Sequence, residues 1–178
     1  MTPIRTVAVA LTATVAASLA ARGVMTRRPA GISPVTGFDI TRYLGRWYEI
    51  ARLDHRFERD MTHVTARYDL NPDGSVQVVN RGRRNGRWKE ARATARSLGD
   101  PATASLAVSF FPGFPGGYHV FELDADYRWA MISGPNRGYL WILSRDPTMN
   151  EATYQRLVGI ARDKGFDVDG LIRVQQEG

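Results

Sequence analysis

The feature that most constrains this chain is a run of eight short segments, between residues 45 and 144, in which apolar and polar residues alternate. Good turn formers separate them, such as Asn-Pro-Asp-Gly at 71–74 and Asn-Gly at 85–86. Alternation is the period of a half-buried strand, and these turns favour hairpins. We expect strands over residues 45–53, 64–70, 75–82, 88–96, 105–111, 118–123, 128–133 and 139–144. The pattern predicts an all-β fold, an eight-stranded antiparallel up-and-down barrel whose hollow suits an acyl chain.

Two residues far apart in the sequence are expected to close one end of this barrel. The first and last strands of an up-and-down barrel are neighbours, so Trp47 and Arg145 fall at the same rim and can stack as a cation–π pair. Gly45 opens the first of these strands. The opposite rim is then the open mouth, where the connections at 54–62, 83–87, 112–117 and 134–138 meet.

The period changes after Arg145. Residues 147–151 resemble a helix capping box, and apolar side chains then recur at helical spacing, at Tyr154, Leu157, Val158 and Ala161. Gly165 is expected to end this helix, and residues 166–174 return as an extended segment along the barrel's exterior. The prediction is one C-terminal α-helix packed outside the barrel.

Composition limits the other possibilities. The 178 residues, with 43% apolar and 24% charged side chains, suit one globular domain. Residues 1–21 read as a signal peptide, 22–37 as a tether and 38–178 as the barrel domain. The absence of cysteine excludes disulfides, thiolate metal sites and cysteine nucleophiles. The net charge of +6 and a pI near 10 favour anionic partners.

No metal site and no cofactor are expected. His55, His63 and His119 have no third ligand at a recognisable spacing.

Strand alternation also supplies a provisional interior lining. Cavity candidates are Val64, Ala66, Tyr68, Val78, Tyr118, Val120, Trp129, Met131, Tyr139 and Trp141. Tyr139 and Trp141 read either as cavity walls or as aromatic residues of a filled core. Glu122 shares the phase of Tyr118 and Val120 and does not fit an apolar lining. It therefore lies near a polar end, or the register slips by one residue there.

The predicted mouth combines positive charge with aromatic side chains. The mouth and headgroup candidates are His55, Phe57, Arg83, Arg84, Arg87 and Phe114. We hypothesise that this cationic, apolar lip docks on an anionic membrane surface and grips a lipid phosphate while the acyl chain enters the barrel. The alternative is a solvated hairpin tip, since runs of charge usually face water. His55 reads either as part of a lid over the entrance or as an ordinary surface histidine.

Three short regions carry a resemblance to a known family. Residues 45–48, Asp126-Tyr127 and Arg145 resemble the three conserved regions of the lipocalins, in order and spacing. Residues 43–52, 54–59, 139–145 and 165–167 look like the bacterial lipocalins related to apolipoprotein D, and the likeness covers residues 38–176. It marks Gly45, Trp47 and Arg145 as fold determinants.

The resemblance implies a non-catalytic protein that binds fatty acids or lysophospholipids. It would store or carry them in the bacterial cell envelope, with a role in membrane maintenance or stress response. Such members are typically lipoproteins on the periplasmic side of the outer membrane, and some form homodimers. Here Arg22 stands where the lipidated cysteine would be, so a soluble periplasmic form is the alternative.

Two other classes of function remain open from the residues alone. One is a lipid-modifying enzyme, although the chain has neither cysteine nor a Gly-x-Ser-x-Gly motif. The other is a module for anionic surfaces or polymers, built on residues 81–96 with Trp88 among basic side chains. Alternation sends Lys89 and Arg92 to opposite faces, so this stretch is not one continuous basic face and no nucleic-acid partner is expected.

Overall fold

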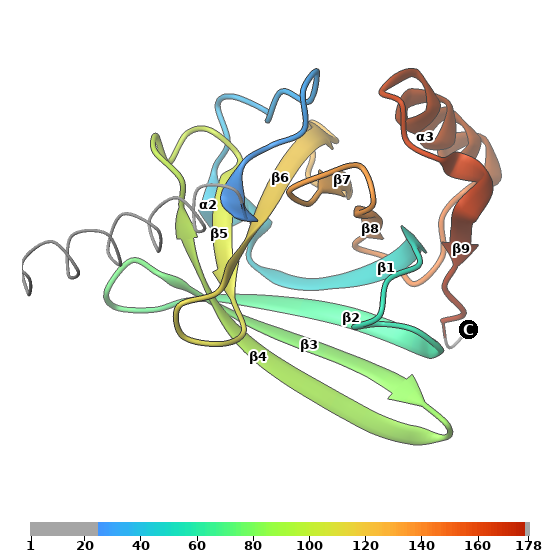
Figure 1. The fold of residues 1–178 in the computed structure, drawn as a ribbon, viewed down its shortest axis with the longest axis horizontal. Coiled ribbons are helices and arrows are strands. Elements are labelled where there is room, and N and C mark those ends of the chain that lie inside the picture. The colour runs from blue at the N-terminus through green and yellow to red at the C-terminus, as the bar shows by residue number, and fades with distance from the viewer. Residues whose placement is uncertain (1–24, 177–178) are drawn as a thin grey trace, which may run out of the picture.

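The computed structural model describes residues 25–176, which form a closed antiparallel barrel (Figure 1). Each strand pairs with the next along the chain, and β1 pairs with both β8 and β2, so the sheet closes on itself. The eight-stranded up-and-down barrel is therefore confirmed. Its strands are β1 (Gly45–Leu53), β2 (Met61–Leu70), β3 (Val76–Arg84), β4 (Arg87–Ser97), β5 (Ser105–Ser109), β6 (Pro115–Leu123), β7 (Trp129–Ser133) and β8 (Leu140–Ser144).

The C-terminal helix packs on the outside of the barrel, as predicted. Helix α3 (Glu151–Asp163) begins after Asn150, whose side chain accepts hydrogen bonds from the first-turn amides. The face that it buries carries Tyr154, Leu157, Val158 and Ala161. A short helix, α2 (Ile40–Tyr43), precedes β1, while a 3₁₀ turn, η1 (Val168–Gly170), and strand β9 (Leu171–Arg173) follow α3.

Two separate apolar clusters lie on the two sides of the sheet. The inner cluster fills part of the barrel and includes Trp47, Tyr68 and Val78. The outer cluster joins α3 to the barrel wall and includes Met131, with Trp129 packed against it. Trp129 and Met131 thus do not line the interior, contrary to expectation. On β7 the inward positions are held by Ala130 and Ile132.

The register shifts in β1, β2 and β6, and two of these β-bulges, in β1 and β6, decide which side chains face the interior. The bulge between Val120 and Glu122 leaves Val120 in the inner cluster and Phe121 in the outer one, and it pairs Glu122 with Met131. Glu122 therefore faces outward, and the register slip considered from the sequence is present. A second bulge in β1, between Glu49 and Ala51, has a functional consequence described below.

The closed rim carries the expected aromatic–cation pair. The guanidinium of Arg145 lies 3.9 Å from the centre of the Trp47 ring and donates to the carbonyls of Leu44 and Arg46 at 2.8 and 2.9 Å. Gly45 has a φ of 90°, which disfavours any residue with a side chain, and a Cβ there would lie 3.4 Å from Arg145 Nη1. The motif residues thus fix the geometry of this rim.

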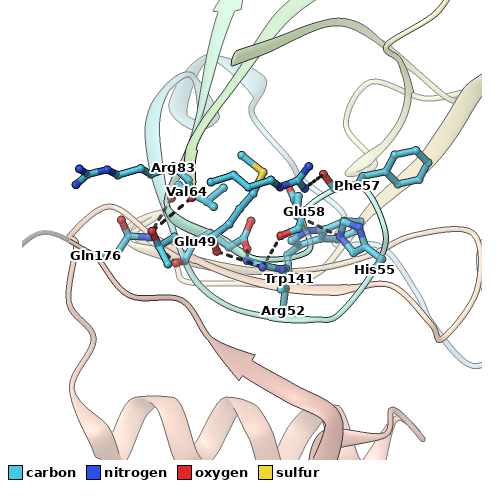
Figure 2. A network of polar contacts seen from close by, with 12 residues as sticks. Glu49, Arg52, His55, Phe57, Glu58, Val64, Arg83, Trp141 and Gln176 are labelled. Atoms are coloured by element: carbon cyan, nitrogen blue, oxygen red, sulfur yellow. Dashed lines mark hydrogen bonds and ion pairs between the residues drawn. The ribbon is translucent and has the colours of Figure 1, made fainter. Parts of the chain in front are cut away.

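The C-terminal segment fills a split in the wall between β1 and β2. Strand β9 pairs with the last residues of β1, and the carbonyl of Gln175 accepts from the His63 amide at 2.6 Å. The side chain of Gln176 donates to the carbonyls of Glu49 and Val64 at 2.7 and 3.0 Å (Figure 2). Residues 171–176 therefore complete the barrel near the mouth, where β1 and β2 no longer pair directly.

The segment before β1 is part of the packed domain. The Val35 amide donates to the Val120 carbonyl, the Val35 carbonyl accepts from the Ala104 amide, and Ile32 is buried in the outer cluster. The described part of the expected tether is therefore not a free linker. The expected signal peptide and Arg22 lie outside the described residues.

Candidate ligand-binding site

Between its floor and the charged residues near the mouth, the barrel interior is largely apolar and combines small with aromatic side chains. Alanine occupies several inward positions, and Tyr118 and Trp141 pack against the inner cluster while keeping part of their surface exposed. Val64 is buried on β2, two residues from Ala66. The structure thus brings together these cavity candidates in the interior: Ala66, Tyr68, Val78, Tyr118, Val120 and Trp141.

Three tyrosines form the floor of this interior. The hydroxyl of Tyr118 lies 2.6 Å from that of Tyr43 and 2.9 Å from that of Tyr68. Burial raises the pKa of all three phenols, which therefore stay neutral at physiological pH. The Tyr43 ring also packs on Trp47, with 4.7 Å between ring centres. The three hydroxyls hydrogen-bond to one another, so the floor presents no unpaired phenol group to the interior.

A buried ion pair stands inside the barrel near the mouth. The bulge in β1 turns both Glu49 and Arg52 inward, where they lie opposite Leu143 and Trp141. Arg52 Nη1 donates to Glu49 Oε1 at 2.8 Å, and only 1% of Arg52 and 3% of Glu49 is exposed. Burial raises the pKa of Glu49 well above its ordinary value, and the nearby charge of Glu58 adds to this shift.

The loop after β1, residues 54–60, lies at the mouth and is bonded to side chains of the barrel interior (Figure 2). We call it the lid loop. Arg52 Nη2 donates to the carbonyls of Glu58 and Met61 at 2.6 and 3.3 Å. Trp141 Nε1 donates to Glu58 Oε2 at 3.0 Å, and His55 Nε2 lies 3.0 Å from the same oxygen. The lid reading of His55 fits this placement, since its ring also packs against Trp141, 5.3 Å between centres.

Glu58 is held as a carboxylate by its neighbours. Burial alone would raise its pKa, but the hydrogen bonds and charges of His55, Trp141 and Arg52 outweigh that effect and lower it. The Glu58 side chain of the loop is therefore a carboxylate held by His55 and Trp141, with the charge of Arg52 nearby, and Glu49 is the carboxyl most ready to hold a proton.

The sequence reading missed Glu49, Arg52 and Glu58. A signal was present, because Glu49 and Arg52 stand three residues apart in a mostly apolar stretch, and in the structure every residue from Glu49 to Leu53 is buried. In a regular strand, two residues at that spacing lie on opposite faces. One of the two charges would then be buried against the outer cluster and would need a counter-ion there. A bulge that turns both inward removes the conflict.

The mouth candidates separate into two groups. Arg84 and Arg87 lie opposite each other on the face of the β3–β4 hairpin that continues the interior, whereas Arg83 lies opposite Trp88 on the other face. Arg84 Nη2 donates to the Phe57 carbonyl at 3.0 Å and so links the hairpin to the lid loop. Tyr139 stacks against Trp141 and lies 5.4 Å from the His55 ring, at the mouth.

Exposed phenylalanines surround this rim. Phe57 is 60% exposed and Phe114 is 66% exposed, as the lip hypothesis requires. Phe110 and Phe111, 41% and 70% exposed, lie in the strand expected over residues 105–111 but follow the end of β5 in the structure.

Within residues 25–176, no three His, Cys, Asp or Glu side chains are arranged to hold a metal ion. No helix in the same range has the length and apolarity needed to cross a bilayer.

Comparisons with known proteins agree with this architecture. The chain is 51% identical over 152 residues to the outer membrane lipoprotein Blc of Citrobacter freundii, covering 84% of this chain and 86% of that protein. It is more distantly similar to apolipoprotein D of Mus musculus, 28% identical over 148 residues, with 78% and 77% of the two chains covered. Among solved structures, the cockroach allergen Per a 4 superposes with a TM-score of 0.66 at 18% identity, over 86% of this chain and 96% of that one.

The family model described as a lipocalin-like domain matches residues 38–176, the same range over which the motifs were recognised. With the closed barrel, the Trp47–Arg145 rim and the relatives in agreement, the chain belongs to the lipocalin family.

Proposed function

We propose that this protein binds a single-chain lipid, a fatty acid or a lysophospholipid, inside its barrel and stores or carries it in the bacterial cell envelope. The observation that carries the proposal is an apolar interior with a sealed floor and a loop over its mouth. Small inward residues such as Ala66 and Ala93 limit how far side chains fill it. The relatives named as outer membrane lipoproteins support the envelope location.

The energetics favour the acyl chain as the main source of affinity. Burying one methylene contributes about 0.8 kcal/mol, so a long acyl chain offers on the order of 10 kcal/mol before the costs of association. An exposed ion pair contributes roughly 0–1 kcal/mol. The tail should therefore set the affinity, and the basic residues at the mouth should decide which lipid is chosen and where it is delivered.

The exposed rim supports transfer at a membrane surface, in line with a role in membrane maintenance or stress response. Phe57, Phe111 and Phe114 are each at least 60% exposed and lie on the β1–β2 and β5–β6 connections, at the same rim as the basic β3–β4 turn. Exposed aromatic side chains next to positive charge suit an anionic bilayer interface. Docking of this rim would bring the mouth to the lipid that it takes up or releases.

Lipid uptake can be tested by blocking the interior. Ala66→Phe adds a ring to a partly exposed inward position, whereas Val79→Phe adds bulk to the outer face of the neighbouring strand. Displacement of a fluorescent fatty acid should weaken at least tenfold in Ala66→Phe and stay unchanged in Val79→Phe. Equal binding by both variants, or no lipid bound by the wild type, would overturn the proposal. Native mass spectrometry should recover the lipid intact, and turnover would point to an enzyme instead.

A further inference from the structure

Resting on the proposed lipid-binding function, we infer that Arg84, Arg87 and Lys89 form a subsite for the phosphate of an anionic single-chain glycerophospholipid. These three side chains, with Asn85, line a hollow of about 510 Å³ at the tip of the β3–β4 hairpin. The hairpin extends to the lower right of Figure 1, well past the rest of the barrel. The hairpin tip therefore projects beyond the rim, and Arg84 links it to the loop over the mouth through the Phe57 carbonyl.

The register places these cations on the face that becomes the barrel interior. Arg84 pairs with Arg87, and Gly82 pairs with Lys89. Side chains of directly opposed residues share one face, and every second pair keeps to it. The same face carries the pairs Asn80–Ala91 and Val78–Ala93, the second of which belongs to the inner cluster. The row of pairs thus leads from the basic hollow into the apolar interior.

The positive charges in the hollow lack counter-ions. Among the described residues neither Arg87 nor Lys89 forms an ion pair, and the nearest acidic side chain on β4, Glu90, is paired with Arg92 at 2.7 Å on the other face. Arg84 Nη2 donates to a carbonyl, while its Nε is buried without a partner. Guanidinium groups and an ammonium directed at one hollow with no carboxylate in its lining match a phosphate group.

The route from the hollow to the interior is open along the edge of β4. Strand β4 pairs with β5 only through residues 94–97, so within the described chain residues 87–93 have no strand partner on that side. Ala91 and Ala93 present little bulk along this edge. A lipid whose phosphate lies in the hollow can therefore lay its chain across these residues and into the barrel.

One buried acceptor lies on this route. Asn80 Oδ1 is buried and has no hydrogen-bond partner, and it lies on the same face one pair beyond Lys89. A buried acceptor without a donor is costly, which makes it a receptive position for a hydroxyl group. The free glycerol hydroxyl of a lysolipid supplies such a donor between the phosphate and the acyl chain.

The charge of the hollow also predicts selectivity among headgroups. A zwitterionic headgroup brings a second cation next to three existing ones, and like charges brought together cost free energy. A free fatty acid has no phosphate. Lysophosphatidate should therefore bind more tightly than lysophosphatidylcholine of equal chain length, through the headgroup alone.

The test compares two double variants of equal charge change on the full chain. Arg87→Ser/Lys89→Ser removes two cations from the hollow, and Arg81→Ser/Arg83→Ser removes two from the other face of the same hairpin. Displacement of a fluorescent fatty acid is measured with lysophosphatidate, lysophosphatidylcholine, palmitate and glycerol 3-phosphate. We expect the wild type and the outer-face variant, Arg81→Ser/Arg83→Ser, to bind lysophosphatidate about tenfold more tightly than lysophosphatidylcholine. The hollow variant, Arg87→Ser/Lys89→Ser, should lose this preference and still bind palmitate normally.

Four results would overturn the inference. If both double variants lose the preference for lysophosphatidate equally, the preference comes from the general charge of the protein. If the hollow variant keeps the preference, the hollow is not the phosphate subsite, but normal palmitate binding would still support the proposed lipid-binding function. Glycerol 3-phosphate binding as tightly as lysophosphatidate would assign the hollow to free phosphates. If the wild type binds none of the lipids, the proposed function fails together with the inference.

Discussion

The buried pair of Glu49 and Arg52 allows a quantitative test of the mouth architecture. We consider Glu49→Met, Arg52→Met and the double variant. Removing one partner of a buried ion pair leaves the other without compensation and costs about 3–5 kcal/mol of unfolding free energy. Arg52→Met also removes the donor that binds the carbonyls of Glu58 and Met61 in the lid loop. Each single variant should therefore be severely destabilised.

The double variant should be far less damaged than the single variants together. With both charges of the pair replaced by methionine, neither partner is left uncompensated, and Glu58 keeps its contacts with His55 and Trp141. The main loss is then the bonds to two carbonyls near the rim, about 1–2 kcal/mol. The sum of the two single losses should thus exceed the loss in the double variant by at least about 4 kcal/mol, a coupling energy that indicates direct contact. A pair 2.8 Å apart with almost no exposure is the physical source of that coupling.

Urea unfolding followed by tryptophan fluorescence measures all four corners of the cycle. The Arg52→Met loss should also depend on pH. In that variant Glu49 has no cation, so its already raised pKa rises further, and stability declines as pH rises from about 4.5 towards that value. Additive single losses, or an Arg52→Met penalty equal at pH 5 and pH 8, would refute the reasoning.

Three further outcomes follow from other parts of the barrel. Arg145→Leu removes a guanidinium that donates to four main-chain carbonyls and stacks on an indole, so urea unfolding should show a loss of about 3 kcal/mol; a loss below about 1 would contradict the role of this rim. Tyr118→Phe leaves two buried hydroxyls without their shared partner and should cost about 1–3 kcal/mol, seen as a lower Tm, whereas an unchanged Tm would mean that water replaces the hydroxyl. Burial lowers the pKa of His119, so the unfolded state protonates first and wild-type stability should fall as pH drops below about 6.5; His119→Asn should flatten this slope, and an equal slope in both proteins would argue against it.

Much of the fold could be predicted because strand periodicity is a strong signal where only one side of a strand is apolar. β3 alternates Val76, Val78 and Asn80 with outward residues, and its predicted face is the observed one. The predicted inward face of β7 was wrong because both sides of this strand are buried, one in the barrel and one under α3. Trp129 and Met131 were as apolar as Ala130 and Ile132, so alternation carried no information about which pair faced inward.

The polar part of the site could not be predicted for a different reason. A charged residue out of phase suggests a bulge but does not locate the extra residue, and the bulge in β1 decides that Glu49 and Arg52 meet. The position of the lid loop depends in turn on that meeting, because Arg52 holds the carbonyl of Glu58. Contacts that depend on a chain of local irregularities are visible only once the backbone is known.

The segment that fills the split between β1 and β2 bears on how the domain assembles. Gln176 joins Glu49 and Val64 across sequence separations of 127 and 112 residues. The gap between the first two strands is therefore sealed only after residues 175 and 176 have been synthesised. Such distant pairings slow folding. A fusion partner attached behind Gln176 would emerge at this seam, whereas one attached ahead of Met25 would leave it untouched.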